Sequence, residues 1–323
     1  MSFKKSFKIK NLILDSNIFY APLAEYTDFA YRKLLRHYHK GLMFCEMIKM
    51  EALVREKTTK QLKYTQNMRP IGAQLCGANL NVVKEASKKI EDQGFDWIDL
   101  NCGCPVPKVT KDGSGAALLK NPKLISDMLK TITSSVNIPV SVKIRAGWDD
   151  NSICFSEIVK IAIDAGCSAI TIHGRTKKQG YSGKSNWDYI KQCKEIAGDK
   201  ILVIGNGDLY TPQDVKDIFD KTACDGVMIA RGMLQTPWLS LDVENYYNKK
   251  QNEKIIIKDV LLKYIDYVMQ EKDGKNAVFD LRRISGWILR GYKDIKQLRI
   301  VINKADSITE IRDNITSFGW EKQ

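Results

Sequence analysis

The sequence predicts an α/β protein: a parallel (β/α)8 barrel of the TIM type, followed by a small all-α domain. Three observations favour this fold. Short runs of β-forming residues recur eight times, separated by segments with helical spacing. Each run ends in an unusual residue, as expected for strands that converge on one barrel mouth. After about residue 240 the strand runs stop, and long amphipathic segments replace them.

The eight runs are rich in β-branched and aromatic residues and are bounded by turn residues. A doubly wound sheet would also alternate strands and helices, but it rarely contains eight such units. We therefore expect a closed parallel barrel. The runs span residues 18–23, 42–47, 71–75, 97–101, 140–145, 169–175, 201–207 and 226–232.

Helices are expected between these runs because apolar residues recur there with the helical period, for example over residues 80–94 and 155–166. Over residues 211–226, Thr211 is the expected N-cap and Pro212 the first helical residue.

The chain changes character beyond Asp242, where no further strand run occurs. We therefore expect a barrel domain over residues 1–240 and a helical domain over residues 241–323. The amphipathic segments of the second domain cover residues 254–270, 276–292 and 295–318.

Composition excludes several classes of protein. A chain of 323 residues with 44% hydrophobic content can bury a large core, and no apolar run approaches the ~20 residues that cross a bilayer. The amino-terminal apolar stretch ends at Asp15, too soon for a signal peptide. We expect a cytoplasmic protein without membrane contact. The eight cysteines are scattered and form no C-x-x-C pair, so neither a disulfide scaffold nor a metal site is expected.

The net charge is +13, and part of the excess is local. Residues 31–69 hold ten Lys and Arg against three Glu, which suits a polyanion such as nucleic acid, although a solvated basic surface would look the same. In the helical part, Arg282, Arg283 and Arg290 surround Trp287. Such cations grip phosphates or lie along a packed helix.

The residues at the ends of the eight runs are expected to meet at the carboxyl end of the barrel, where barrel active sites are built. The strand-end residues are Pro22, Glu46, Gln74, Asn101, Lys143, His173, Asn206 and Arg231.

Two glycine-flanked turns follow the seventh and eighth runs, which is where these barrels commonly bind phosphate. Asn206, Gly207 and Arg231 would hold a monophosphate, since the chain has neither a G-x-G-x-x-G nor a P-loop motif; alternatively, these glycines only form tight turns. Lys143 and His173 lie beside this site and can stabilise an anionic reduced flavin, although a single Lys or His is often structural or simply exposed.

The other strand ends suit the same cofactor. Gln74 can bond the polar edge of a flavin, and the backbone of Pro22 and Leu23 can pack beneath it.

Cys102 and Cys104 lie two residues apart, which is too close for an unstrained disulfide. Two thiols are also too few to bind a metal without further ligands. Pro105 stiffens the turn after Cys104. A thiol with a pKa near ~8.5 is mostly protonated at neutral pH and can donate a proton. The alternative is an inert buried thiol.

Residues 100–122, "LNCGCPVPKVTKDGSGAALLKNP", resemble the signature of the tRNA-dihydrouridine synthases, in particular the bacterial B type. Similar segments occur in the same order along nearly the whole chain. They are residues 21–28, 46–47, 74–77, 142–149, 173–190, 205–212, 225–239 and 282–291.

The resemblance implies an FMN-dependent enzyme that uses NADPH, or alternatively NADH, to reduce uridine in the D-loop of tRNA, with no obligate protein partner. Reduced FMN would give hydride to C6, and Cys104 would give a proton to C5. The implied flavin contacts are Pro22, Leu23, Gln74, Lys143, His173, Asn206, Gly207, Asp208, Ala230 and Arg231. The implied tRNA contacts are Asn101, Arg145, Arg175, Tyr181, Arg282 and Arg283.

The chain departs from this family at a few positions. Glu25-Tyr26 replaces a common Gly-Val pair, Leu23 replaces a Met, and Ile284 and Ile288 replace a His and a Tyr. Two other functions are compatible with the sequence. One is a flavin barrel that reduces a free pyrimidine or dihydroorotate, and the other is a tRNA-binding protein that has lost catalysis.

Overall fold

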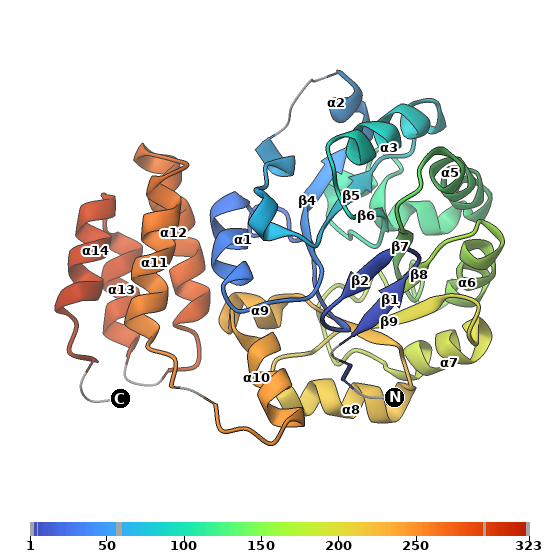
Figure 1. Cartoon of the computed structure of the whole chain (residues 1–323). Coiled ribbons are helices and arrows are strands. Elements are labelled where there is room, and N and C mark those ends of the chain that lie inside the picture. Colours follow the sequence, from blue (N-terminus) through green and yellow to red (C-terminus); the bar gives the residue numbers. More distant parts are fainter. Residues whose placement is uncertain (1–2, 5, 56–59, 253, 293–294, 321–323) are drawn as a thin grey trace.

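The structure, a computed structural model, describes residues 3–4, 6–55, 60–252, 254–292 and 295–320. Its centre is a closed barrel of eight parallel strands in the order β10-β3-β4-β5-β6-β7-β8-β9. Helices surround the barrel, and the carboxyl-terminal helices form a separate group beside it (Figure 1). The predicted fold class is confirmed.

Each of the eight predicted runs overlaps one barrel strand, and β4, β5 and β6 extend one or two residues beyond their predicted ends. The barrel closes where β10 pairs in parallel with β3, with Val227 opposite Ile18. The strands are β3 (Ile18–Tyr20), β4 (Met43–Lys49), β5 (Ile71–Cys76), β6 (Trp97–Cys102), β7 (Val140–Arg145), β8 (Ala169–His173), β9 (Leu202–Asn206) and β10 (Gly226–Ile229).

The helices around the barrel bury their apolar faces against the strands. The α-helices are α1 (Phe29–Arg36), α2 (Met50–Arg55), α3 (Val83–Asp92), α4 (Pro107–Thr110), α5 (Pro122–Ser135), α6 (Phe155–Asp164), α7 (Asp188–Ala197), α8 (Pro212–Thr222), α9 (Arg231–Gln235) and α10 (Leu239–Tyr247). Short 3-10 helices occur at η1 (Lys60–Leu62), η2 (Gln66–Met68), η3 (Leu80–Val82) and η4 (Gly115–Lys120).

The amino-terminal end of the barrel is closed by apolar packing. Phe19, Trp97 and Met228 lie in one buried cluster inside the barrel. A short hairpin that the sequence did not predict, β1 (Phe7–Ile9) and β2 (Leu12–Leu14), adds Leu14 to this cluster. Polar groups that point inward therefore gather toward the opposite, carboxyl end of the strands.

The carboxyl-terminal group contains α11 (Ile257–Met269), α12 (Gly274–Ile288), α13 (Lys296–Lys304) and α14 (Ile308–Ser317). The third predicted segment is thus two helices, because Ser307 caps α14 by accepting a hydrogen bond from the N–H of Glu310. No helix in the described part of the chain has the length and hydropathy needed to cross a bilayer.

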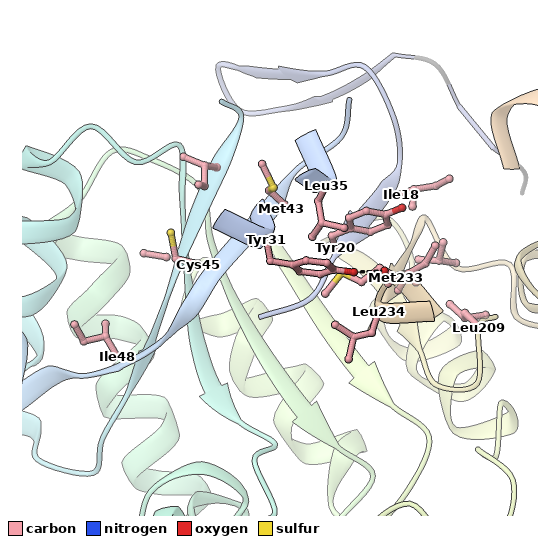
Figure 2. Packing of buried hydrophobic residues seen from close by; sticks show 14 of the residues in the cluster. Ile18, Tyr20, Tyr31, Leu35, Met43, Cys45, Ile48, Leu209, Met233 and Leu234 are labelled. Atoms are coloured by element: carbon pink, nitrogen blue, oxygen red, sulfur yellow. Dashed lines mark hydrogen bonds between the residues drawn. The ribbon is translucent and has the colours of Figure 1, made fainter. Parts of the chain in front are cut away.

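The group packs on the barrel through α1, where Tyr31 and Tyr264 lie edge to face with ring centroids 5.8 Å apart. The hydroxyl of Tyr31 donates to the carbonyl oxygen of Met233 at 2.6 Å (Figure 2). The same tyrosine therefore ties α1 both to α9 and to α11.

The predicted helix start at Thr211 is confirmed as a capping box. The Thr211 hydroxyl accepts from the N–H of Asp214, and the Asp214 carboxylate accepts from the N–H of Thr211. Thr211→Ala should lower the free energy of unfolding by about 1 kcal/mol, because one N–H at the helix start loses its partner. Urea denaturation measures this loss, and Thr211→Ser is the matched control that keeps the hydroxyl. An alanine variant as stable as the serine variant would contradict the capping role.

Candidate active site

The polar ends of the strands meet at the carboxyl end of the barrel, as predicted. Strand register places Asn101 opposite Lys143, and His173 opposite Asn206. The ammonium group of Lys143 donates to the side-chain oxygen of Asn206 at 3.0 Å, which joins β7 to β9 across the intervening β8. The side chains of neighbouring strands therefore point into one shared space.

Burial and mutual repulsion set the charges in this space. Desolvation lowers the pKa of Lys143 to about 8, and Arg145 adds to this effect. Burial, together with the surrounding cations, holds the pKa of His173 well below its usual value, so its ring is neutral at pH 7. The site thus carries positive charge from Lys143, Arg145 and Arg231 but none from His173.

The loop after β6 is held in place by Asn101. Its side-chain oxygen accepts hydrogen bonds from the backbone N–H groups of Gly103 at 3.1 Å and Cys104 at 2.9 Å. The guanidinium of Arg145 donates to the carbonyl oxygen of Gly103 at 2.9 Å. Gly115 passes close by with φ +61°, and a Cβ there would lie 2.9 Å from the carbonyl oxygen of Cys104. The loop therefore requires a glycine at 115.

The two thiols of this loop have different environments. Cys102 is fully buried in the core cluster, whereas Cys104 is half-buried. Burial raises the pKa of Cys104, although the N–H of Val106 and the cations Arg145, Lys143 and Lys49 oppose this rise. Cys104 therefore remains a protonated thiol at neutral pH, as an acid must before it acts.

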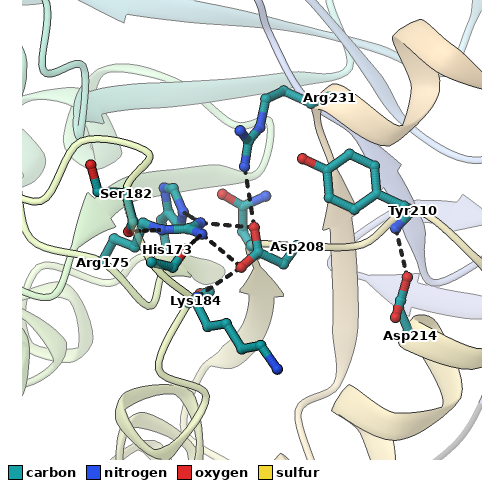
Figure 3. Close-up of polar contacts among 12 residues, drawn as sticks. His173, Arg175, Ser182, Lys184, Asp208, Tyr210, Asp214 and Arg231 are labelled. Carbon is teal, nitrogen blue, oxygen red and sulfur yellow. Dashed lines mark hydrogen bonds and ion pairs between the residues drawn. The ribbon is translucent and has the colours of Figure 1, made fainter. Parts of the chain in front are cut away.

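Asp208, which follows β9, is the centre of an ion-pair cluster with Arg175 and Arg231 (Figure 3). Both of its carboxylate oxygens accept from Arg175, at 2.9 and 2.7 Å, and Arg231 donates to one of them at 3.1 Å. The backbone N–H of Ser185 donates to the other at 2.8 Å. Asp208, which the resemblance assigns to the flavin, is thus paired with Arg175 and Arg231, and its contact with a flavin stays a prediction.

Arg175, an expected tRNA contact, is only 2% exposed. Besides Asp208, its guanidinium bonds the carbonyl oxygens of Ser182 and Gly183 and so holds the loop that carries Tyr181. Tyr181 itself is 55% exposed, and the guanidinium carbon of Arg231 lies 4.4 Å from its ring centroid. An exposed aromatic ring beside cations can stack on a nucleobase.

The turn after β9 has the shape expected of a phosphate cradle. Gly207 has φ +125°, and a Cβ at this position would lie 2.3 Å from Ser185 Oγ and 2.9 Å from His173 Cδ2. Ser185 Oγ is buried and has no hydrogen-bond partner within the described residues. A narrow glycine turn, an unsatisfied hydroxyl and the Arg231 guanidinium fit an anionic phosphate group. Ala230 is the residue before Arg231, the first residue of α9.

Arg282 and Arg283, two other expected tRNA contacts, are bonded within the protein. Arg282 Nε donates to the carbonyl oxygen of Ala305 at 2.9 Å. Arg283 pairs with Asp280 at 2.5 Å and lies 3.6 Å from the carboxylate of Glu25. Contact of either arginine with RNA stays a prediction, and in this structure both serve packing.

The departures from the family pattern also have structural roles. Glu25 has φ +69°, and its N–H donates to Glu46 at 2.5 Å. The guanidinium carbon of Arg283 lies 4.8 Å from the ring centroid of Tyr26. Glu25 and Tyr26 thus join the barrel to α12. Ile284 and Ile288 are buried in the core, where their side chains make apolar contacts.

Some basic residues of the stretch 31–69 are paired within the protein, whereas Lys40, Arg55 and Lys60 are exposed, so both interpretations of that stretch stay predictions. Arg36 is largely internal and donates to four backbone carbonyl oxygens. Lys63 pairs with Glu271 of the helical group, and Arg69 pairs with Asp96. Lys57, which also contributed to the count, lies outside the described residues.

Four further residues shape the site without having been singled out in the sequence: Asp99, Gly115, Ser141 and Ser185. Asp99 could have been recognised from the sequence, because it is a charged residue within the otherwise apolar run "WIDL". A carboxylate inside a buried strand needs partners and is therefore seldom incidental.

Comparison with known proteins gives consistent matches. A family model described as "Dihydrouridine synthase (Dus)" matches residues 19–318. A "probable tRNA-dihydrouridine synthase" of Rickettsia prowazekii is 34% identical over 319 residues, covering 96% of this chain and 97% of the relative. The tRNA-dihydrouridine synthase B of Pasteurella multocida is 34% identical over 318 residues, covering 95% and 93% respectively.

Solved structures show likeness of fold. Histamine dehydrogenase from Rhizobium sp. 4-9 has a TM-score of 0.56 at 14% identity, over 81% of this chain and 50% of that chain. A 2-naphthoyl-CoA reductase complex has a TM-score of 0.58 at 10% identity, over 76% and 52%.

Cys104 should react with iodoacetamide only at alkaline pH, because the thiolate is the nucleophile and burial keeps the thiol pKa above its usual value. Mass spectrometry of the labelled Cys104 peptide across about pH 6 to 12 follows how labelling rises with pH. Cys154, whose pKa burial raises to about 11, is the reference in the same digest. A Cys104 midpoint near neutral pH would show a thiolate and rule out a resting acid.

Proposed function

Because this chain belongs to the dihydrouridine synthase family of oxidoreductases, we propose that it reduces the C5=C6 bond of uridine in the D-loop of tRNA. The proposed cofactor is FMN and the proposed reductant NADPH. The observation that carries this proposal is Cys104, a protonated and half-buried thiol at a cationic barrel mouth, and the glycine turn at Gly207 supports it because its shape suits a phosphate.

The residues at the mouth fit FMN. Gly207, Ala230 and Arg231 would hold its phosphate, with Asn206 beside them and Asp208 orienting Arg231. Lys143 and Gln74 would face the ring system from β7 and β5, neutral His173 would lie at its edge, and Pro22 and Leu23 would form the floor. When bound and reduced by NADPH, FMN supplies the hydride that uridine accepts at C6.

Cys104 would supply the other hydrogen. As the C5=C6 π bond breaks and C6 gains hydride, C5 takes the proton from Cys104 Sγ. The thiolate left behind is stabilised by Arg145, Lys143 and the N–H of Val106, the groups that already oppose the rise in its pKa. A proton from solvent then restores the thiol.

The uridine must leave its stacked position to reach the mouth, as bases do in other base-modifying enzymes. Tyr181 would stack on the nucleotide that enters, with Arg145 and Asn101 nearby. We propose that residues 1–240 carry the chemistry and that residues 241–323 help to position tRNA. In the second part the guanidinium carbon of Arg290 lies 4.1 Å from the ring centroid of Trp287, a pair suited to phosphate and base contacts.

Cys104→Ala should lower turnover by about 10²- to 10⁴-fold, the usual contribution of a positioned acid. The measurement is dihydrouridine in tRNA by mass spectrometry after incubation with NADPH, with FMN content and tRNA affinity expected to remain at parent values. Cys102→Ala is the matched control and should keep most of the activity. Parent-level turnover in Cys104→Ala would remove Cys104 from the mechanism, and activity on free uracil without tRNA would assign a different substrate.

Gly207→Ala should weaken FMN binding about tenfold or more, because overpacking against Ser185 and His173 costs ~1–3 kcal/mol. Flavin absorbance per mole of purified protein reports the loss. Gly166→Ala is the control, since Gly166 also has positive φ, but no atom of the described residues lies within 4 Å of the point that its Cβ would occupy. Equal flavin content in the two variants would argue against the cradle.

A further inference from the structure

Asp99 is a buried carboxylate that the proposed chemistry does not use. It lies in the middle of β6, is 0% exposed, and points into the barrel between Trp97 and Asn101. It accepts hydrogen bonds from Gln74 Nε2 at 2.7 Å and from the hydroxyl of Ser141. Ser141 in turn accepts from the indole N–H of Trp97 at 2.8 Å.

A chain of amide groups connects Asp99 to the Cys104 loop. Asn101 Nδ2 donates to Gln74 Oε1 at 2.7 Å, and Asn101 Oδ1 accepts from the N–H groups of Gly103 and Cys104. The chain is therefore a relay of directional hydrogen bonds from Asp99 through Gln74 and Asn101 to the Cys104 backbone.

Both ends of this relay fix its direction. Backbone N–H groups can only donate, so Asn101 must present its oxygen to the loop and its nitrogen to Gln74. Gln74 must then present its oxygen to Asn101 and its nitrogen to Asp99. The sulfur of Met47, 3.4 Å from Asn101 Nδ2, is also an acceptor and agrees with this orientation.

Position 99 therefore has to accept on two sides at once. An ionised carboxylate does so, because it accepts at both oxygens and donates at neither. Burial raises the pKa of Asp99 to about 6, while the hydrogen bonds from Ser141 and Gln74 and the nearby Lys143 favour the ionised form. Asp99 is thus mostly a carboxylate at neutral pH.

We propose that Asp99 is a positioning residue that fixes the direction of the Gln74–Asn101 relay and so holds the Cys104 loop in its reactive position. The proposal rests on the proposed function in assigning the reaction to Cys104. The relay itself is independent of that assignment and can be tested separately through stability.

Asp99→Asn has nearly the same shape but breaks the relay. If the new side chain accepts from Gln74, its NH2 group faces Ser141, whose own proton then loses its acceptor. If the new side chain accepts from Ser141 instead, its NH2 group faces Gln74, and the Gln74 amide must turn over to accept from it. Asn101 must then turn over as well, so that its NH2 group faces the N–H groups of Gly103 and Cys104. Either arrangement leaves a buried polar group unsatisfied.

Asn101→Asp in the same chain should repair the second arrangement. The introduced carboxylate at position 101 accepts from Gln74 Nε2 and from the two loop N–H groups. Gln74 Oε1 accepts from the introduced amide at position 99, and the oxygen of that amide accepts from Ser141. The double variant therefore gives each amide, carboxylate and hydroxyl group of the relay a partner in the reversed direction, and only the weak contact with the Met47 sulfur is lost.

The experiment compares Asp99→Asn, Asn101→Asp and the double variant for thermal midpoint and for single-turnover uridine reduction by the prereduced holoenzyme. Asp99→Asn should lose about 10²-fold in rate, the usual effect of misplacing a reacting group by ~1 Å, while tRNA affinity stays at the parent value. The double variant should be more stable and at least tenfold faster than Asn101→Asp alone.

Two controls distinguish the effect of hydrogen-bond direction from the effect of removing the charge at position 99 and from general damage to the core. Asp99→Leu combined with Asn101→Asp removes the same charge but offers Gln74 no donor, so it should not recover either property. Thr171→Val alters a buried hydroxyl that has no partner among the described residues and should leave the rate unchanged.

Parent-level turnover in Asp99→Asn would overturn the proposal. So would losses of rate and stability in the double variant equal to the sum of those in the two single variants. Equal recovery of rate and stability with leucine at position 99 would overturn it too. If Cys104→Ala proved fully active while the stability of the double variant still recovered, the relay would stand and the assigned reaction would fall.

Discussion

The inward face of β6 is the constraint on which the rest of the site depends. Side chains alternate along a strand, so Trp97, Asp99 and Asn101 all point into the barrel. Trp97 belongs to the apolar cluster at one end, Asp99 lies in the middle, and Asn101 holds the Cys104 loop at the other end. One strand thus links the packed base of the barrel to the thiol at its mouth.

Electrostatics at the mouth follow from burial and compensation. Lys143, Arg145 and Arg231 lie close together, and their repulsion is offset by Asp99 on one side and Asp208 on the other. Each carboxylate accepts hydrogen bonds from the protein at both of its oxygens, and such bonds allow a charge to persist away from water. The result is a cationic space with a neutral thiol beside it, suited to an anionic reduced cofactor and a proton donor.

Much of this arrangement follows from the sequence, because β-runs that end in polar residues are visible without coordinates. The strand-end pattern predicts Lys143, His173 and Asn206 at the mouth, and the structure brings them together. It does not predict the division between α13 and α14, although Ser307 with Glu310 is a readable capping pattern. The hairpin of β1 and β2 could not be recognised, since strands of three residues carry too little periodicity.

Other roles depend on partners that are distant in sequence. The sequence alone suggests that Arg283 binds phosphate. In the structure it contacts Glu25 and Tyr26, which lie more than 250 residues earlier in the chain. Likewise, the sequence suggests that Arg36 is a surface charge, but in the fold its guanidinium is hydrogen-bonded to backbone carbonyl oxygens. Local patterns predict which residues are unusual, whereas tertiary contacts decide which of them remain available.

The central claim is that Cys104 delivers the proton to C5 of the uracil. A crystal structure of the protein with FMN and its tRNA substrate tests this most directly. The account predicts Cys104 Sγ about 3–3.5 Å from C5 of the bound uracil. A sulfur turned toward the core, with another acidic group in contact with C5, would contradict it.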